Sequence, residues 1–202
     1  MSRIEVKSWP DYRATRGRFD VVDLPARHYL MIDGHGDPNT TAFADAVQTL
    51  YPVAYTAKFA AQRELGLDCV VPPLEGLWWA EDMDSFTTAR DKSRWDWTLM
   101  ILTPDDWPAD LISAAIETVR VKKAPARLND LRHERLAEGR CVQTLHIGPF
   151  DAEAEVLKIL HHKEILGRGW SMTGRHHEIY LSDFRRVPEA RRRTILRQPV
   201  SR

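Results

Sequence analysis

Apolar and polar residues alternate along the chain with periods that change from strand to helix. Residues 26–33 predict a strand, which stops at the turn formed by Gly34, Gly36 and Pro38. Helical spacing follows, carried by Phe43, Val47, Leu50 and Ala54. Pro52 lies inside this helix, and because proline lacks the amide N–H and clashes with the preceding turn, we expect it to kink or split the helix.

The middle of the chain predicts further strands and then a long helical region. Residues 68–71 and 74–80 are strand-like, and in residues 94–102 alternation places Trp95 and Trp97 on one face. Thr103, followed by proline, is typical of a helix start. We expect helix to about residue 139, divided near Pro125, with 127–139 as a charged surface helix, whereas residues 1–23 predict an irregular segment.

The second half repeats the order of the first half. A strand at 140–148, a helix opening at Asp151 and a strand at 176–183 precede a basic tail that starts at Pro188. We interpret the chain as one α+β domain, 1–202, in which a strand, helix, strand, strand unit is duplicated at about 24–125 and 126–202. Such units can form one antiparallel sheet, with helices stacked on one face and the other face curved into a ligand cleft at the pseudo-two-fold seam.

Residues 175–184 contain the most informative polar pattern. Strand alternation directs His177, Ile179 and Leu181 to one face, and Glu178 and Tyr180 to the other. Glutamate is unfavourable in a strand, so its carboxylate either faces water at an edge or lies in a cavity. In a cavity, desolvation would make it a base or a partner for a cation, and a nearby tyrosine favours this alternative.

Aromatic residues are numerous, with seven Trp, five Tyr and six Phe. Tyr51, Tyr55 and Phe59 are spaced by four and form a helical stripe, either in the core or on a ligand wall. Trp78 and Trp79 are adjacent, so that only one of them can face a cleft. These rings suit a planar, lipophilic or cationic ligand.

The charge balance and the cysteine content limit the classes of partner and the cellular compartment that we expect. The 29 basic and 29 acidic residues cancel, which gives no global field that favours nucleic acid or an anionic membrane. Cys69 and Cys141 lack a CxxC pattern, and no apolar run is long enough for a membrane span. We therefore expect a soluble cytoplasmic protein that binds a small molecule, as a monomer or a homodimer.

Several further motifs could indicate binding of a metal, a nucleic acid or a cofactor. The pairs His161–His162 and His176–His177 suggest a metal, but neighbours on a strand face opposite ways and no carboxylate stands at ligand spacing, so we predict no metal. His146 is either a pocket donor or a core histidine. The arginine-rich tail is either a solvated helix face or a nucleic-acid contact. No phosphate-binding or dinucleotide motif is present, which predicts no cofactor.

The chain resembles the GyrI-like small-molecule-binding family, and within it the stand-alone branch that includes cyclopropanoid cyclopropyl hydrolases. The matching segments are MIDGHGDPN, LYPVAYTAKF, PLEGLWWAED, WDWTLMILTPDDW, GRCVQTLHIGPFDAE, GRHHEIYLSD and RRTILRQPV. The resemblance implies a buried carboxylate at Glu178 that faces the phenol of Tyr55. It also implies cavity walls formed by Trp79, Trp97 and Tyr180.

Three functions follow from this resemblance and from the residues. The first is hydrolysis of a strained cyclopropane ring in a planar DNA-alkylating compound, with Glu178 as base and Tyr55 as hydrogen-bond donor. The second is sequestration of lipophilic or cationic compounds without chemistry. The third is inhibition of a topoisomerase by a protein surface. The sequence leaves open whether the acidic loop at 81–85 covers the cleft.

Overall fold

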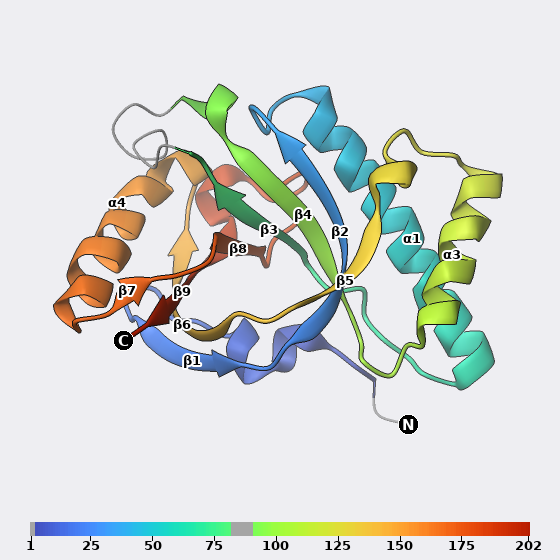
Figure 1. Cartoon of the computed structure of the whole chain (residues 1–202), viewed down its shortest axis with the longest axis horizontal. Coiled ribbons are helices and arrows are strands. Elements are labelled where there is room, and N and C mark those ends of the chain that lie inside the picture. The colour runs from blue at the N-terminus through green and yellow to red at the C-terminus, as the bar shows by residue number, and fades with distance from the viewer. Residues whose placement is uncertain (1–2, 82–90) are drawn as a thin grey trace.

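The computed structural model describes residues 3–81 and 91–202 and shows an α+β architecture, as the sequence predicted (Figure 1). Within these residues nine strands form one sheet in which all strand pairs are antiparallel. The strands are β1 (Asp20–Leu24), β2 (Arg27–His35), β3 (Leu74–Trp79), β4 (Asp96–Thr103), β5 (Arg132–Leu136), β6 (Gly139–Ile147), β7 (Ser171–Met172), β8 (His176–Tyr180) and β9 (Arg193–Ser201). The helices are α1 (Thr41–Leu65), α3 (Ala109–Lys122), α4 (Glu153–Lys158) and a π-helical continuation, Ile159–Ile165.

The sheet is arranged as two similar halves. Each half runs strand, helix, strand, strand along the chain, as β2, α1, β3, β4 and then as β6, α4, β8, β9. The strand order β6-β9-β8-β3-β4-β2 places the hairpin β3–β4 beside the hairpin β8–β9, so that β8 pairs with β3 at the centre. This pairing is the seam between the halves. The exact boundaries of the repeats stay a prediction.

A long two-stranded ribbon curls the sheet. β1 pairs with β6 and β2 pairs with β5. Both ladders have the same register, since Asp20 lies opposite Gln143 in one and Arg27 lies opposite Leu136 in the other. The ladders therefore belong to one ribbon, which bends at residues 25–26 and 137–138. Because the two ends of the strand order, β1 and β5, lie in this same ribbon, the sheet bends back on itself. Residues 20–24, predicted to be irregular, are strand β1.

Helix α1 is continuous through Pro52. Its buried face packs on the sheet and includes Phe43, Val47, Leu50 and Val53. The helix ends where Gly66 adopts the left-handed conformation that glycine tolerates. The predicted split at Pro52 is wrong, because burial of this long apolar face outweighs one lost hydrogen bond.

The second predicted helical region is much shorter than expected. Helix α3 ends at Lys122, and residues 132–136, predicted to be helical, form the edge strand β5 beside β2. Charged side chains are frequent on exposed edge strands because they discourage further pairing, so the charged sequence fits this position. Residues 68–71 form no strand, and only Cys69 makes an isolated bridge, with Ile4.

The predicted basic tail is instead a central strand. β9 lies between β6 and β8, and most of its residues are buried. Its apolar residues are interspersed with Thr194, Arg197 and Gln198, all of which are buried, and neighbouring segments supply partners for the polar groups of Arg197 and Gln198. The predicted helix face consisted of Arg185, Arg186, Arg191, Arg192 and Arg193, which lie in turns, in or next to a short 3-10 helix and at the start of β9. The expected helix is therefore wrong, whereas all of these arginines except Arg192 are exposed to solvent as expected.

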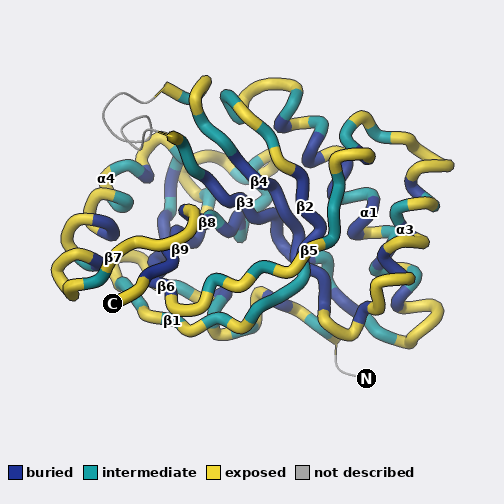
Figure 2. The backbone as a smooth tube through the Cα atoms, in the orientation of Figure 1, coloured by how far each residue is buried: buried dark blue, intermediate teal, exposed yellow. Residues whose placement is uncertain are grey.

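Two apolar layers cover the sheet. On one face α1 and α3 pack against residues such as Leu30, Leu99 and Trp78, while Leu160 and Ile165 after α4 pack against Val142. On the other face lies a second apolar cluster, which the N-terminal segment covers with Val6 and Tyr12. The remaining buried members of this cluster are Tyr29, Met31, Leu77, Met100, Leu102, Leu145, Ile179 and Ile195. Figure 2 shows that the central strands are mostly buried, whereas β7 is exposed and β5 is partly buried.

A search of the described helices for a membrane span finds none with the required length and apolar character.

Candidate functional site

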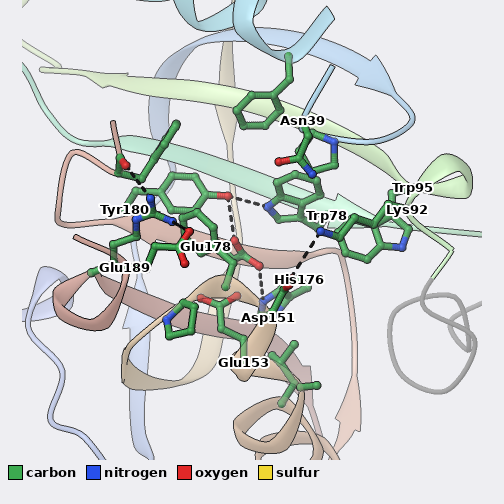
Figure 3. Close-up of a pocket in the computed structure, with 18 residues that line it drawn as sticks. Asn39, Trp78, Lys92, Trp95, Asp151, Glu153, His176, Glu178, Tyr180 and Glu189 are labelled. Atoms are coloured by element: carbon green, nitrogen blue, oxygen red, sulfur yellow. Dashed lines mark hydrogen bonds and ion pairs between the residues drawn. The ribbon is translucent and has the colours of Figure 1, made fainter. Parts of the chain in front are cut away.

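A cavity of about 420 Å³ opens at the seam, on the face of the sheet that carries the helices. The beginning of α1, strands β3 and β8, and the beginning of α4 contribute to its walls (Figure 3). Among the described residues, six aromatic side chains line it: Phe43, Trp78, Trp95, Phe150, Tyr180 and Phe184. The expectation of a cleft at the seam is confirmed, but the cleft does not lie on the face opposite the helices, because α1 and α4 stand apart and leave the centre of their own face open.

Glu178 is held in this cavity by an oriented chain of hydrogen bonds. The indole Nε1 of Trp78 donates to the hydroxyl oxygen of Tyr180 at 3.0 Å, and that hydroxyl donates to Oε2 of Glu178 at 2.8 Å (Figure 3). Because an indole N–H is only a donor, the hydroxyl proton of Tyr180 is directed to the carboxylate. Only 13% of the Glu178 side chain is exposed.

Tyr180 remains a proton donor throughout the physiological range. Burial and, after it, the negative charge of Glu178 raise the pKa of the Tyr180 phenol well above its usual value. The other carboxylate oxygen, Oε1 of Glu178, lies 3.6 Å from Nε2 of His176, which also lines the cavity. One oxygen of Glu178 is thus fixed by Tyr180, and the other faces a histidine at a distance too long for a hydrogen bond.

The ring of His176 packs edge to face against His161, with 6.0 Å between the ring centroids. His161 comes from the π-helical segment Ile159–Ile165, a type of distortion that is frequent at functional sites. Burial, and after it the neighbouring His176, lowers the pKa of His161 to about 3. His161 is therefore neutral at physiological pH and adds no charge to the cavity.

The charged groups of the lining are mainly acidic. Besides Glu178 they comprise Asp151, Glu153 and Glu189, against the cations Lys92 and Arg192. Lys92 lies 3.5 Å from Asp151, and Arg192 lies 3.1 Å from Glu189, with its guanidinium over the ring of Phe150 at 5.3 Å. The described lining therefore carries more negative than positive groups, which favours ligands with positive charge.

Sequence reasoning placed Glu178 and Tyr180 correctly on one face of a strand, and both line the cavity. The two tryptophans chosen for the walls lie elsewhere. Trp79 is on the opposite face of β3, where the guanidinium of Arg175 lies 3.5 Å from its ring centroid, and Trp97 is fully buried below Phe43. Their neighbours, Trp78 and Trp95, line the cavity instead.

The aromatic stripe on α1 is outside the cavity. The side chains of Tyr55 and Phe59 are 47% and 52% exposed, and their rings follow Tyr51 along the helix surface at centroid distances of 6.3 and 6.4 Å. None of the three belongs to the cavity lining. The expected pairing of Tyr55 with Glu178 is not formed, because α1 enters the cavity only with its first turn; the phenol that contacts Glu178 is Tyr180.

His146 is a buried histidine beside the cavity and not part of its described lining. Its Nε2 lies 3.1 Å from the carbonyl oxygen of Pro149, and burial lowers its pKa. The described residues contain no group of three or more His, Cys, Asp or Glu side chains arranged to hold a metal ion. Of the acidic loop at 81–85, residues 82–85 lie outside the described residues.

Sequence reasoning missed a buried charged network on the other face of β8. His177, fully buried, lies 2.9 Å from Oε2 of Glu75 and 3.0 Å from the carboxylate of Glu138. Tyr12 donates to the other oxygen of Glu75 at 2.5 Å, and Arg197 lies 3.6 Å from Glu138. The face to which alternation directs His177, Ile179 and Leu181 therefore contains two carboxylates, a histidine and an arginine. The available signal was the polar His177 within that face.

Burial alone would lower the pKa of His177, but the charges and hydrogen bonds of Glu138 and Glu75 raise it to about 9. The imidazole is therefore protonated near neutral pH, between two carboxylates. His177 and Glu75 are cross-strand partners of Leu77 and Ile179 at the β3–β8 seam. The network thus joins the two strands that carry Trp78 and Glu178 toward the cavity.

Comparison with known proteins gives a consistent result. A family model described as GyrI-like small molecule binding domain matches residues 18–200. A comparison with curated proteins gives no match.

Solved structures from Listeria innocua are similar over nearly the whole chain. An uncharacterized conserved protein is 35% identical, with a TM-score of 0.88 and coverage of 98% of this chain and 100% of that one. A hydrolase is 33% identical, with a TM-score of 0.87 and coverage of 99% and 100%. The EcmrR C-terminal domain is 9% identical, with a TM-score of 0.54 and coverage of 92% and 98%, which shows likeness of fold alone.

Proposed function

The chain belongs to the family of GyrI-like small molecule binding domains, and from this premise we propose that it hydrolyses the strained cyclopropane ring of planar, DNA-alkylating natural products. Such an activity would protect a cell from genotoxins. Support comes from the two similar Listeria innocua structures described as hydrolases, each 33% identical to this chain. The observation that carries the proposal is the carboxylate of Glu178, desolvated among aromatic rings and oriented by Tyr180.

The reaction needs a base next to a bound water molecule. In a cyclopropane fused to a conjugated dienone, water attacks the ring CH₂, one ring C–C bond breaks, and its electron pair moves into the dienone to give a phenolate. Glu178 takes a proton from the attacking water and then returns it to solvent, and the phenolate takes one proton from solvent, so that one water is added in total and the base is regenerated. General-base assistance of this kind contributes roughly 10² to 10⁴ in rate.

The described cavity supplies the other requirements in a form that differs from the sequence prediction. The aromatic lining accommodates a flat substrate and limits access of bulk water to Glu178. Negative charge that develops on the substrate oxygen requires a donor or a cation, worth about 3 kcal/mol when preorganised. Tyr55 is outside the cavity, so we assign this role to the cationic side chains of the lining, Lys92 and Arg192.

The test uses a compound with a cyclopropane-fused cyclohexadienone, incubated with the full chain in ¹⁸O-labelled water and analysed by mass spectrometry. We expect a product heavier by one labelled water. Glu178→Gln should lower the rate at least 100-fold, because the amide is not a base. The matched control is Glu117→Gln, which makes the same change in an exposed carboxylate of α3 that is paired with Arg120 and lies outside the lining, and it should hydrolyse at the wild-type rate. Hydrolysis by Glu178→Gln at the wild-type rate would exclude this mechanism.

The second candidate is binding without chemistry, favoured by the excess of carboxylates among the aromatic rings of the lining. Aromatic faces and a desolvated carboxylate together attract lipophilic cations. In that case Glu178 serves as a counter-charge. A mixture of compounds analysed before and after incubation separates the two candidates, since a sequestering protein retains a compound of unchanged mass and a hydrolase releases a hydrated one.

A further inference from the structure

His176 is a buried side chain whose hydrogen-bonding capacity is unused within the described chain. It is 7% exposed and lines the cavity, and neither of its ring nitrogens has a hydrogen-bond partner among the described residues. Leaving a buried polar nitrogen without a partner costs about 1 to 3 kcal/mol, so such groups in folded proteins require an explanation. A ligand that enters the cavity would supply the missing partner.

The surroundings of His176 leave only the cavity side for that partner. The ring of His161 packs against it edge to face, and this neighbour is neutral because its pKa is lowered to about 3. On its own strand, Oε1 of Glu178 lies 3.6 Å from Nε2 of His176. Oε1 is the oxygen that Tyr180 does not contact, because the phenol donates to Oε2.

When the ring of His176 carries its single proton on Nδ1, its Nε2 and Oε1 of Glu178 are two acceptors on one wall, 3.6 Å apart. A nitrogen donor bonds each acceptor at about 2.9 Å, and the separation is shorter than twice that length, so one ligand nitrogen with two N–H groups reaches both. A quaternary cation carries the same charge and has no N–H to donate. Only the first type of cation uses both acceptors.

We propose that His176 and Glu178 form a two-point subsite for ammonium groups, which distinguishes ligand cations that carry N–H from quaternary cations of equal charge. Glu178 supplies negative charge to either type of cation, and the hydrogen bonds to the two acceptors, one of which is His176, supply the discrimination. The aromatic rings of the lining hold the apolar part of the ligand. This inference rests on the small-molecule binding proposed above and specifies the chemical class that the polar wall selects.

The experiment measures the affinities of three probes for the full chain by calorimetry at about pH 8, where histidine side chains are typically neutral and a primary alkylamine is charged. The probes are (1-naphthylmethyl)ammonium, (1-naphthylmethyl)trimethylammonium and the neutral 1-methylnaphthalene. The wild-type protein should bind the ammonium at least tenfold more tightly than the trimethylammonium, because the trimethylammonium can donate neither of the two charge-assisted hydrogen bonds.

Substitutions separate the two members of the subsite. His176→Leu should weaken binding of the ammonium about tenfold and leave the trimethylammonium and the neutral probe within about twofold. His176→Gln keeps an acceptor and should restore part of the loss. Glu178→Gln should weaken both cations and leave the neutral probe unchanged. Unchanged affinity for 1-methylnaphthalene, together with an unchanged melting temperature, shows that a variant is folded.

Equal losses for both cations in His176→Leu, or equal affinities of the two cations for the wild-type protein, would overturn this inference while the binding function stands. If the wild-type protein bound none of the three probes, the proposed binding function would fail, and the subsite with it. The two failures are therefore distinguishable in a single set of titrations.

Discussion

The buried network around His177 should make the stability of the fold depend on pH in a defined direction. His177 is fully buried between the carboxylates of Glu75 and Glu138, which raise its pKa to about 9. A raised pKa in the folded state means that the folded protein holds a proton that the unfolded chain loses more easily. The stabilisation is complete below the unfolded pKa of about 6.5 and is lost as the pH rises through the folded pKa.

The size of the effect follows from the two pKa values. Each pKa unit corresponds to about 1.4 kcal/mol, so the difference between 6.5 and about 9 amounts to about 3 kcal/mol of unfolding free energy. About 2 kcal/mol of this is lost between about pH 6.5 and about pH 8.5, because part of the titration lies above that range. His177 is not exposed to solvent, so screening by water does not reduce this contribution to the unfolding free energy.

Urea unfolding at intervals from about pH 6.5 to about pH 8.5, followed by tryptophan fluorescence, measures this slope. Near the upper end of the range the thiols of Cys69 and Cys141 add a further loss, because burial raises their folded pKa values to about 11 and about 12 while the unfolded thiol pKa is about 8.5. Near the lower end, histidines with lowered folded pKa values take up protons on unfolding, which makes stability rise with pH and opposes the effect of His177. These contributions are common to the wild-type protein and to a variant without His177, so the difference between their slopes measures His177.

The matched variant is His177→Gln, which keeps a polar side chain and removes the titration. It should be less stable than the wild-type protein at low pH and should lose the part of the slope that comes from His177, whatever its absolute stability. Glu138→Gln should move the loss to lower pH, since it removes a charge that raises the pKa of His177. An equal slope in the wild-type protein and in His177→Gln would refute the reasoning.

Three further outcomes follow from the structure. Tyr180→Phe removes the hydroxyl that orients Glu178 and should weaken binding of the naphthyl ammonium about tenfold, whereas Tyr55→Phe, at an exposed position outside the cavity, should leave it within about twofold. Gly34→Ala places a Cβ within the ring of the fully buried Trp97 and should lower the unfolding free energy by about 1 to 3 kcal/mol, measured by urea unfolding. His161, whose folded pKa is lowered to about 3, should make the unfolding free energy fall on acidification, because the unfolded chain binds a proton that the folded protein does not. Replacement of His161 by leucine should reduce the fall in unfolding free energy between about pH 6.5 and about pH 4.5 by about 2 kcal/mol.

Much of the fold is accessible from local patterns. The alternation in residues 26–33 and 94–102 corresponds to strands β2 and β4, and the helical spacing from Phe43 corresponds to α1. The missed elements are those whose local sequence is charged or irregular. Residues 132–136 form strand β5 and were expected to be helical. The strand was missed because a charged segment that pairs only at a sheet edge shows no alternation of apolar and polar residues.

The site shows the same division between local and long-range information. Glu178 and Tyr180 are two residues apart on one strand, so their common face followed from the period of two. The choice of Trp78 over Trp79 depends on which face of the sheet carries the open cavity. Trp95 and Trp97 share a face, and Trp97 is excluded because it is fully buried against Phe43. The position of Tyr55 depends on how far α1 extends beyond that cavity.

The sequence by itself determined the period of each strand, the duplicated order of elements, and the presence of a carboxylate and a phenol on one strand face. The tertiary structure decided which rings surround that carboxylate, which phenol contacts it, and that the opposite face of the same strand contains a buried charged network. The physical reason is that side-chain direction within a strand is fixed by local geometry, whereas solvent access and neighbours arise from pairing between residues far apart in the chain. His177 pairs with Glu75, 102 residues away, and no local pattern contains that contact.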